Sequence, residues 1–400
     1  MIVFRSNYQI LLLVCLLFSG CGQNKVDNTG DIPVIDIIGN LGNYEGVPVS
    51  RYITELEYIP LETNDNCLFA DENWELLLTS THIFVQGGRY CYAFDRNGRF
   101  LGQIGSLGQG PGEFNYLTGF TIDENNQVLY LETYRTLLKY SWDGVFHQSI
   151  KLPENIHGIP LCDNFFVRDN LFLGHFRNHK GDFLHNFALY NQSSEVIKSF
   201  DNYVQFNPKV LVTGWVNRCM KPYRIGEHIY VKEISNDTLF YLNERNGLIP
   251  HFVFDLGKYT ITKEMRESRE PSNLYSVNGQ INLPTSMPMI DTQNNLFFSF
   301  SAYNLSGKYS FPKKMNRSIV TPSSSGLIIF QGGGTIIDSH AVLGVYDTTN
   351  QTTQLLDTDP VTQIIGLIND LDGGLSFWPQ YYTSENELVD IWRVEDMKEH

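Results

Sequence analysis

A repeated pattern of four short apolar segments limits what this 400-residue chain can fold into. Within each repeat, apolar and polar residues alternate, which is the period of a half-buried β-strand. Turn residues separate the segments; the pair Asn97-Gly98, for example, favours a type I′ hairpin turn, because both of its residues accept positive φ. Almost no helical period runs longer than two turns. The clearest repeats cover residues 76–104, 120–150, 165–200 and 221–254.

This spacing predicts an all-β fold, namely a six-bladed β-propeller of four-stranded antiparallel blades. Two looser repeats follow at Met289–Leu356 and Ile364–Val394, which makes six units in residues 34–400. Dividing that span by six gives about 61 residues per blade, a better fit than seven. We expect a strand near Leu56–Leu61 to close the last blade beside Asp390–Val394, which removes free sheet edges. A large sandwich or solenoid is the competing fold.

The first twenty residues have the pattern of a signal peptide. One basic residue, Arg5, precedes the apolar run Ile10–Phe18, which is shorter than the roughly 20 residues that span a bilayer. The run leads into Ser19-Gly20-Cys21, which resembles a bacterial lipobox. The alternative is an ordinary signal peptide followed by a chance cysteine.

We therefore expect three segments: a signal peptide over 1–20, a lipidated Cys21 with a flexible tether over 21–33, and the propeller over 34–400. The tether is polar and contains Gly, Asn and Asp. Lipid on Cys21 would make the membrane a partner of the protein, since buried acyl chains hold a domain on its surface. The predicted location is exported and lipid-anchored, with the outer membrane favoured.

Composition narrows the function classes. The net charge of −15 leaves no cationic excess to neutralise phosphates, so nucleic acid is not an expected partner. After Cys21, the remaining cysteines of the mature chain are too few and too scattered for a disulfide scaffold. Cys67 and Cys91 are the one pair near enough in sequence to share a sheet. They are either bridged or are buried free thiols.

One stretch of the chain resembles a known family. Phe94-Asp95-Arg96-Asn97-Gly98 leads into Gly110-Pro111-Gly112-Glu113-Phe114, and weaker matches lie at residues 235–259 and 369–379. These residues resemble the NHL-like six-bladed β-propellers found as lipoproteins in Bacteroidetes. The resemblance implies the propeller fold and a surface location, and it implies no settled activity. The fifth unit departs from the family pattern with an insertion-like stretch at Tyr303–Ser325.

The glycine-rich part of that stretch is predicted to be a structural turn. It consists of Gly108, Gly110, Pro111, Gly112 and Glu113. A phosphate-binding loop would need Gly-Lys-Ser/Thr at the start of a helix, whereas here the next element is a strand. We therefore expect a blade-to-blade turn in which Glu113 accepts backbone N–H groups.

No catalytic or metal-binding set stands out in the sequence. There is no Gly-x-Ser-x-Gly motif of a hydrolase. His175, His179 and His185 cluster around one hairpin with Asp182, but His179 falls at its tip, where solvation is expected. No metal ligands and no cofactor are predicted, and catalytic residues cannot be assigned.

A few aromatic and arginine residues fit a binding surface instead. Propellers bind ligands with loops at the channel mouth, and aromatic platforms with arginine forks suit sugars, carboxylates or peptide termini. The alternative is that the aromatic rings pack between blades and the arginines pair locally with acids. The candidates are His175, Arg177, Trp215, Arg218, Tyr223, Arg224, Trp378, Tyr381 and Tyr382.

The sequence is compatible with three functions. The favoured one is a surface-anchored propeller that binds a glycan, a peptide or a partner protein in the bacterial cell envelope, with no catalysis evident. The alternative is a propeller enzyme, a lyase or hydrolase on polysaccharide or peptide, with its site at the channel mouth. The third is a structural subunit of an envelope complex, which would present a large apolar patch.

Overall fold

The fold is taken from a computed structural model. It describes residues 32–45, 59–68, 75–178, 181–207, 222–225, 228–233, 236–268, 280–282, 290–291, 295–303, 317–323, 326–332, 339–356 and 378–379. The expected signal peptide, Cys21 and most of the tether lie outside these residues. None of the helices in the described part of the chain is long and apolar enough to cross a membrane.

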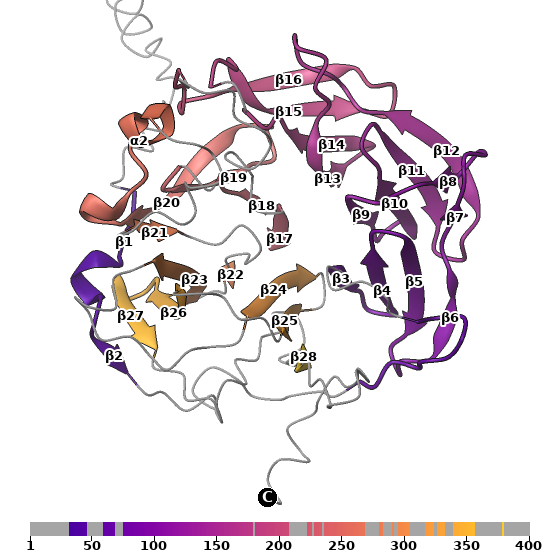
Figure 1. Ribbon diagram of the computed structural model, residues 1–400, viewed down its shortest axis with the longest axis horizontal. Coiled ribbons are helices and arrows are strands. Elements are labelled where there is room, and N and C mark those ends of the chain that lie inside the picture. The colour runs from indigo at the N-terminus through magenta and orange to yellow at the C-terminus, as the bar shows by residue number, and fades with distance from the viewer. Residues whose placement is uncertain are drawn as a thin grey trace, which may run out of the picture. The chain divides into compact units, whose positions relative to one another are not determined.

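Four successive sheets have the four-stranded antiparallel layout of a propeller blade (Figure 1). The predicted repeats at 76–104, 120–150, 165–200 and 221–254 each become one of them, which confirms an all-β, propeller-like fold. The first blade contains β3 (Glu75–Leu78), β4 (His82–Gly87), β5 (Tyr90–Asp95) and β6 (Phe100–Gln103); the second contains β9 (Gly119–Asp123), β10 (Val128–Glu132), β11 (Thr136–Ser141) and β12 (Phe146–Lys151); the third contains β13 (Cys162–Arg168), β14 (Leu171–His175), β15 (His185–Asn191) and β16 (Val196–Asp201); the fourth contains β17 (Tyr223–Ile225), β18 (His228–Val231), β19 (Thr238–Leu242) and β20 (Leu248–Asp255).

Apolar side chains fill each gap between successive blades. The third residue of the second strand packs toward the next blade in all four cases. These residues are Phe84, Tyr130, Leu173 and Tyr230, and none is more than 3% exposed. Burying one such side chain stabilises the fold by about 1.5–3 kcal/mol. The gaps between blades are therefore the hydrophobic core of the molecule.

The same hairpin turn joins the third and fourth strands of each blade. Its first residue is Asp95, Ser141, Asn191 or Asn243, and that side chain accepts backbone N–H groups from within the turn. The fourth residue has positive φ, as in Gly98 at +81° and Gly144 at +87°. The predicted type I′ turn at Asn97-Gly98 is wrong, because Gly98 has positive φ and Asn97 does not. The turn is a three-residue loop whose last residue is left-handed.

Beyond the fourth blade, the described strands form two further sheets. One contains β21 (Gln280–Asn282), β22 (Ile290–Asp291), β23 (Asn295–Tyr303), β26 (Ser339–Asp347) and β27 (Thr352–Leu356). The other contains β24 (Arg317–Ser323), β25 (Gly326–Gly332) and β28 (Trp378–Pro379). The described residues thus hold four four-stranded blades, and the expected count of six is not confirmed.

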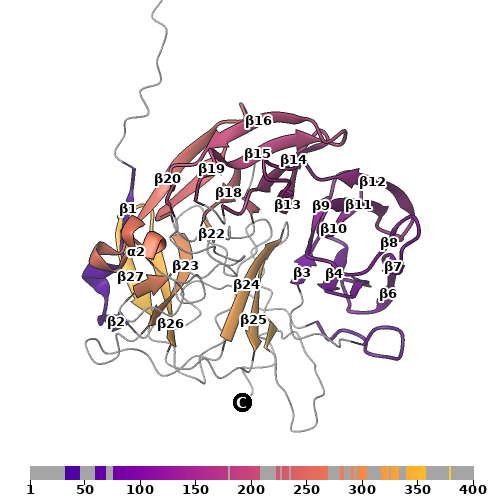
Figure 2. The same ribbon diagram turned by 45° about the horizontal axis from the view of Figure 1, so that its top comes forward.

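The insertion expected at Tyr303–Ser325 extends further along the chain than predicted. Between β23 and β26, the described residues form the hairpin of β24 and β25, which reaches Gly332. This hairpin pairs with β28 instead of joining the fifth sheet, and β24 contacts β3 of the first blade (Figure 2). Apart from β28, the sixth predicted repeat lies outside the described residues.

Two short N-terminal strands extend the fourth and fifth sheets. β1 (Val34–Asp36) pairs in parallel with β20, and β2 (Tyr44–Glu45) pairs in parallel with β27. The backbone N–H of Asp36 also donates to Thr353 Oγ1 at 3.0 Å. The strand expected near Leu56–Leu61 is not seen in its described part, since Ile59–Leu61 forms no strand and Ile59 packs into the first blade. The rest of that closure, including its partner at 390–394, falls outside the described residues.

Smaller elements complete the described chain. A 3₁₀ turn at Ile38–Asn40 (η1) follows β1, and another at Gly257–Tyr259 (η3) follows β20. The charged stretch after η3 forms the short helix α2 (Lys263–Ser268). Cys67 and Cys91 are both buried and free, so they are not bridged.

Candidate functional site

Each blade has a buried polar residue at or next to the end of its second strand. Counting from His82, Val128 and Leu171, which all stand opposite the first residue of the hairpin turn, the fifth residues are Gln86, Glu132 and His175. In the fourth blade the corresponding residue is Lys232, directly after β18. Because side chains alternate along a strand, the fifth residue shares a face with the apolar third residue. All four are at most 4% exposed.

A β-bulge at the start of β13 places a carboxylate beside His175. Cys162 pairs with His175 and Phe165 with Leu173, so Asp163 and Asn164 together stand opposite the single Gly174. Asp163 adopts a φ of +52°, an uncommon conformation for a residue with a side chain. A Cβ at position 174 would collide with the Asn164 side chain, so the bulge depends on glycine there. Bulges of this kind re-aim a side chain, here that of Asp163.

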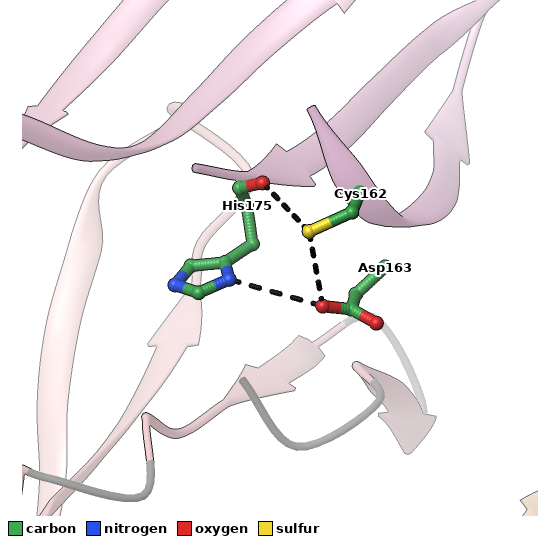
Figure 3. A group of neighbouring side chains, drawn as sticks. All are labelled: Cys162, Asp163 and His175. Carbon is green, nitrogen blue, oxygen red and sulfur yellow. Dashed lines mark hydrogen bonds and ion pairs between the residues drawn. The ribbon is translucent and has the colours of Figure 1, made fainter. Parts of the chain in front are cut away.

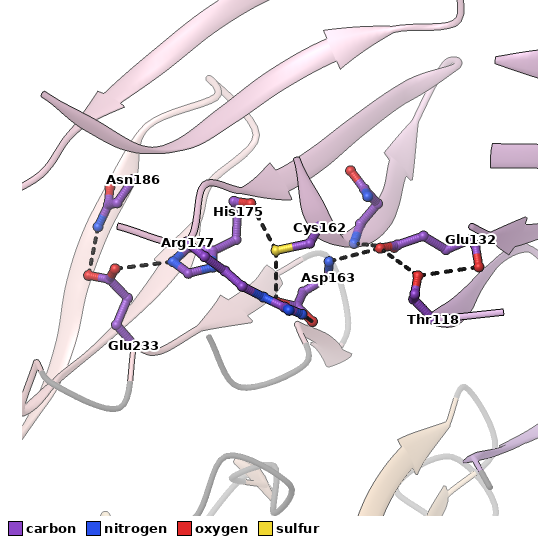
Figure 4. Close-up of polar contacts among 9 residues, drawn as sticks. Thr118, Glu132, Cys162, Asp163, His175, Arg177, Asn186 and Glu233 are labelled. Carbon is purple, nitrogen blue, oxygen red and sulfur yellow. Dashed lines mark hydrogen bonds and ion pairs between the residues drawn. The ribbon is translucent and has the colours of Figure 1, made fainter. Parts of the chain in front are cut away.

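His175 links two carboxylates from different blades (Figure 4). Its Nε2 lies 3.2 Å from Glu233 Oε1, and its Nδ1 lies 3.8 Å from Asp163 Oδ2. Asn186 donates from Nδ2 to the other Glu233 oxygen at 2.7 Å. Burial alone would lower the pKa of His175, but its contacts with Asp163 and Glu233 outweigh burial and raise that pKa.

Asp163 is partly exposed to solvent, with 24% of its side chain accessible. Arg177 approaches Asp163 Oδ1 to 3.5 Å, and the Cys162 thiol donates to Asp163 Oδ2 at 3.3 Å and to the His175 carbonyl at 3.2 Å. Burial would raise the pKa of Asp163, yet His175 and Arg177 hold it well below its usual range. Burial and the Asp163 charge raise the pKa of the Cys162 thiol, which therefore stays protonated.

Glu132 reaches this group from the second blade. Its carboxylate accepts the backbone N–H groups of Asp163 at 3.2 Å and Asn164 at 2.8 Å, and also the Thr118 hydroxyl at 3.3 Å. Burial and the charge of Asp163 outweigh these hydrogen bonds and raise the pKa of Glu132 to about 7. We refer to Glu132, Cys162, Asp163, Asn164, His175, Arg177, Asn186 and Glu233 as the charged cluster.

Four buried polar atoms of the charged cluster have no hydrogen-bond partner among the described residues. They are His175 Nδ1, Asn164 Nδ2, Arg177 Nε and Asn186 Oδ1. Buried polar atoms in folded proteins are almost always paired with protein, water or a ligand. All four belong to residues of the third blade, where water or a ligand would complete their hydrogen bonding.

The structure brings only some of the predicted binding residues together. His175 and Arg177 both lie in the charged cluster. Tyr223 is 1% exposed and stacks on Tyr230 with ring centroids 5.1 Å apart, so it packs within the core. Arg224 donates to the carbonyls of Phe166 and Val167 and so joins the fourth blade to the third. Trp378 lies in β28, and Trp215, Arg218, Tyr381 and Tyr382 lie outside the described residues.

In the predicted histidine hairpin, the described residues Asp182 and His185 have separate partners. Asp182 lies 3.5 Å from His157 instead, and His185 lies 3.4 Å from Asp201. His179 falls outside the described residues. A different group of metal-ligand types does converge, however: donor atoms of Cys162, Asp163 and His175 all lie within 4.8 Å of one another (Figure 3).

The glycine-rich stretch folds into a loop between the first and second blades. Glu113 Oε2 accepts the N–H of Gly110 at 2.8 Å, and the N–H of Gly108 donates to the Phe114 carbonyl at 3.0 Å. The short parallel strands β7 (Ser106–Leu107) and β8 (Glu113–Phe114) frame the loop, and Tyr140 donates its hydroxyl to the Gly112 carbonyl. Glu113 is thus occupied inside its own turn.

Comparison with known proteins adds information on the fold. No curated protein matches the chain. A Bacteroides fragilis protein named as exported has a TM-score of 0.56 and 17% identity over 81% of this chain and 80% of its own. A DUF4221 family member from Bacteroides vulgatus gives 0.46, with 10% identity over 79% and 98%. Streptogramin B lyase gives 0.40, with 10% identity over 81% and 92%. Of these three, the first is close enough to define a shared fold.

The chain also matches a family model along nearly its whole length. The matched family is described as a domain of unknown function, DUF4934, and the match spans residues 32–400. Since it covers far more than half of the chain, the protein belongs to the DUF4934 family.

Proposed function

We propose that this protein is an exported, lipid-anchored β-propeller of the bacterial cell envelope that binds a ligand at the charged cluster. The observation that carries the proposal is the set of four buried polar atoms in the third blade that have no hydrogen-bond partner among the described residues. The signal-peptide pattern before Cys21 supports export, as does the similarity to a Bacteroides protein named as exported. The ligand would be a glycan, a peptide or a partner protein.

The exposed members of the cluster favour a ligand with an oxygen-rich group. Arg177 and Asp163 are 30% and 24% exposed, so a ligand arriving from solvent meets them first. Two of the unpartnered atoms, Arg177 Nε and Asn164 Nδ2, are hydrogen-bond donors. Carboxylates and sugar hydroxyls accept hydrogen bonds from donors of this kind, and a planar guanidinium matches the geometry of a carboxylate.

The proposed propeller has six blades, as the NHL-like resemblance implies. The fifth sheet repeats the strand–turn–strand order of the earlier blades, with Asp347 at the start of the turn after β26. We assign the sheet of β24, β25 and β28 as the sixth blade, because β24 contacts β3 of the first blade and also β17 of the fourth. Closing the circle in this way would pack the first and last blades against each other and leave only short, protected sheet edges.

A lyase or hydrolase at the channel mouth is the second candidate. One observation favours it: His175 lies between two carboxylates, an arrangement that suits a general acid or base. The ring is fully buried, so a proton would have to reach a substrate through Asp163. Turnover assays on any ligand found by binding would separate this candidate from simple binding.

The test is a thermal-shift screen of the purified chain against glycans and short peptides. A ligand at about 100 times its Kd stabilises a protein by about 2.7 kcal/mol, which moves the melting temperature by a few degrees. We expect the shift to disappear in Arg177→Gln and to persist in Arg135→Gln. Arg135 is a matched control because it also pairs with a carboxylate, Glu154, at 2.7 Å on the second blade. An equal shift in both variants, or no ligand in the panel or in envelope extracts, would overturn the proposal.

A further inference from the structure

Three side chains of different chemistry point toward one another at the bulge of β13. Cys162 Sγ, a carboxylate oxygen of Asp163 and His175 Nδ1 lie within 4.8 Å of one another. Sulfur, oxygen and imidazole nitrogen are the donors of zinc sites in proteins. We infer that these three residues bind a divalent transition-metal ion of the zinc type. The inference rests on the proposed function only in placing a binding site at the charged cluster.

Two of the three donor–donor distances are close to those around a tetrahedral ion. Zinc binds sulfur at about 2.3 Å and nitrogen or oxygen at about 2.0–2.1 Å, so ligand atoms of one ion lie about 3.3–3.6 Å apart. Here Cys162 Sγ lies 3.3 Å from Asp163 Oδ2, and His175 Nδ1 lies 3.8 Å from the same oxygen (Figure 3). The remaining pair, Cys162 Sγ and His175 Nδ1, lies within 4.8 Å, so a side-chain movement of about 1 Å would complete the geometry.

The surroundings of His175 are those of a metal ligand. Nδ1, which faces the other two donors, is buried and has no hydrogen-bond partner among the described residues. Nε2 donates to Glu233, and Glu233 is itself held by Asn186 (Figure 4). A metal-bound histidine usually donates its second N–H to a carboxylate in this way, which fixes the ring and its tautomer.

Like His175, Asp163 has a second partner on the side that faces away from the proposed metal. Its Oδ2 faces Cys162 and His175, while its Oδ1 is approached by Arg177 at 3.5 Å. The bulge and the positive φ of Asp163 hold the carboxylate at this point of the strand. Ordinary strand geometry would send the side chains of Cys162 and Asp163 to opposite faces. The local irregularity is therefore what brings the two donors together.

The donor set selects the ion and leaves room for a ligand. Thiolate and imidazole favour zinc over magnesium or calcium, which prefer oxygen. On binding, the Cys162 S–H bond breaks, any proton on His175 Nδ1 is released, sulfur–metal and nitrogen–metal bonds form, and the protons pass to solvent. The thiolate and the Asp163 carboxylate together neutralise the two charges of the ion. Three protein donors leave a fourth position for a water or for an oxygen of the proposed ligand.

Metal binding is measured with metal alone. The purified chain is stripped with a chelator, dialysed against zinc chloride and analysed for bound metal; cobalt chloride is then used as a spectroscopic probe. We expect one zinc per chain and a cobalt–thiolate charge-transfer absorption. Cys162→Ser should abolish that absorption, and His175→Gln should weaken zinc binding at least about 100-fold. Glu233→Gln should weaken it about 10–100-fold, the range for loss of a supporting hydrogen bond.

The matched control is Cys67→Ser. Cys67 is also a free thiol, more buried than Cys162, and it donates to a backbone carbonyl, that of Glu62, at 3.2 Å, as Cys162 does to His175. It should keep both the zinc and the cobalt absorption. If Cys162→Ser does not fold, the cobalt spectrum of the unaltered chain still decides whether a thiolate binds the metal. Zinc binding that survives both Cys162→Ser and His175→Gln would overturn the inference, and so would a cobalt spectrum without thiolate character.

The outcome is separable from that of the proposed function. Zinc binding without any glycan, peptide or protein ligand would uphold the metal site and refute the ligand-binding role. Ligand binding by a chain that takes up no zinc would uphold the proposed function and refute the metal site. Magnesium chloride serves as the negative ion in both experiments, since its oxygen preference does not suit this donor set.

Discussion

The first and third blades share their strand order and hairpin turn but differ at one position. In both, the third residue of the second strand, Phe84 or Leu173, is fully buried against the next blade. Two residues further on, the first blade has Gln86, whose amide donates to the carbonyl of Gly87 in its own strand. The third blade has His175, which binds a carboxylate of the fourth blade. The blade scaffold thus fixes the position of the fifth residue of the second strand. The identity of that residue decides whether the space between the blades holds a neutral amide or a charged network.

The largest expected effect tests whether apolar packing contributes equally to stability in two places: between the first and second blades, and between the third and fourth blades. Phe84→Ala should reduce the free energy of unfolding by about 3–5 kcal/mol and Leu173→Ala by about 2–5 kcal/mol, because each leaves a cavity between two blades. Urea denaturation followed by fluorescence measures both. If either variant left the free energy of unfolding nearly unchanged, the packing in the two places would not be equivalent.

The next effect should distinguish the polar contacts of the first blade from those of the third. Glu233→Ala removes one partner of a buried, hydrogen-bonded pair and should cost about 3 kcal/mol, whereas Gln86→Ala should cost about 1 kcal/mol. The same denaturation experiment measures both variants, and Glu233→Gln shows how much of the loss belongs to the charge. Equal costs for the two alanine variants would mean that the charged cluster does not distinguish the third blade.

A smaller effect concerns the turn that all four blades share. Gly98 and Gly144 both have positive φ. A Cβ atom added at position 98 would overlap the Pro60 carbonyl oxygen, whereas a Cβ atom added at position 144 would have its nearest neighbour at 3.5 Å. Gly144→Ala should therefore cost about 1–2 kcal/mol from backbone strain alone, and Gly98→Ala should cost more. Melting temperatures of the two variants provide the comparison. A larger loss for Gly144→Ala would contradict the packing of Ile59–Leu61 over the first blade.

The smallest effect is a pair of opposite titrations. Burial lowers the pKa of His82 in the first blade despite nearby Asp95, so its contribution to stability is present above pH 6.5 and is lost as the pH falls through the lowered value. The raised pKa of His175 has the opposite consequence, since its contribution is present below pH 6.5 and is lost as the pH rises through the raised value.

Nuclear magnetic resonance of the imidazole groups in the metal-free chain measures both pKa values. The variants His82→Gln and His175→Gln assign the two signals. Two histidines that titrate together near pH 6.5 would show that the surroundings of the first and third blades do not differ in this respect.

The four clear blades could be predicted because their signals are local. Alternating apolar residues and a turn such as Asp95–Gly98 specify a hairpin within a few residues, and the hairpins repeat along the chain. β1 and β2 could not be predicted, because they are three and two residues long and pair in parallel with strands far along the sequence. The position of β24 and β25 was missed for the same reason, since nothing near Arg317–Gly332 indicates which sheet the hairpin joins.

Only part of the candidate site could be predicted. His175 and Arg177 were predicted as part of a binding surface at the channel mouth, but the carboxylates that surround them come from three blades and could not be identified from the sequence. A weak signal was present: the second strands read His82–Gln86, Val128–Glu132, Leu171–His175 and His228–Lys232, each an apolar run that ends in a polar residue. The bulge that turns Asp163 toward His175 had no signal of its own, because it depends on pairing with β14.

The pairing of the N-terminal strands sets an order on folding. Asp36 is bonded to Thr353, a residue 317 positions later in the chain, and β1 completes its sheet only when β20 is in place. Contacts so distant in sequence form slowly, and an unpaired strand edge can associate with other molecules in the meantime. During synthesis, the segment around Val34–Glu45 must therefore wait for the fourth and fifth sheets. A chain cut short before β27 would leave β2 without its partner strand, so early termination should yield a product that aggregates instead of a smaller stable protein.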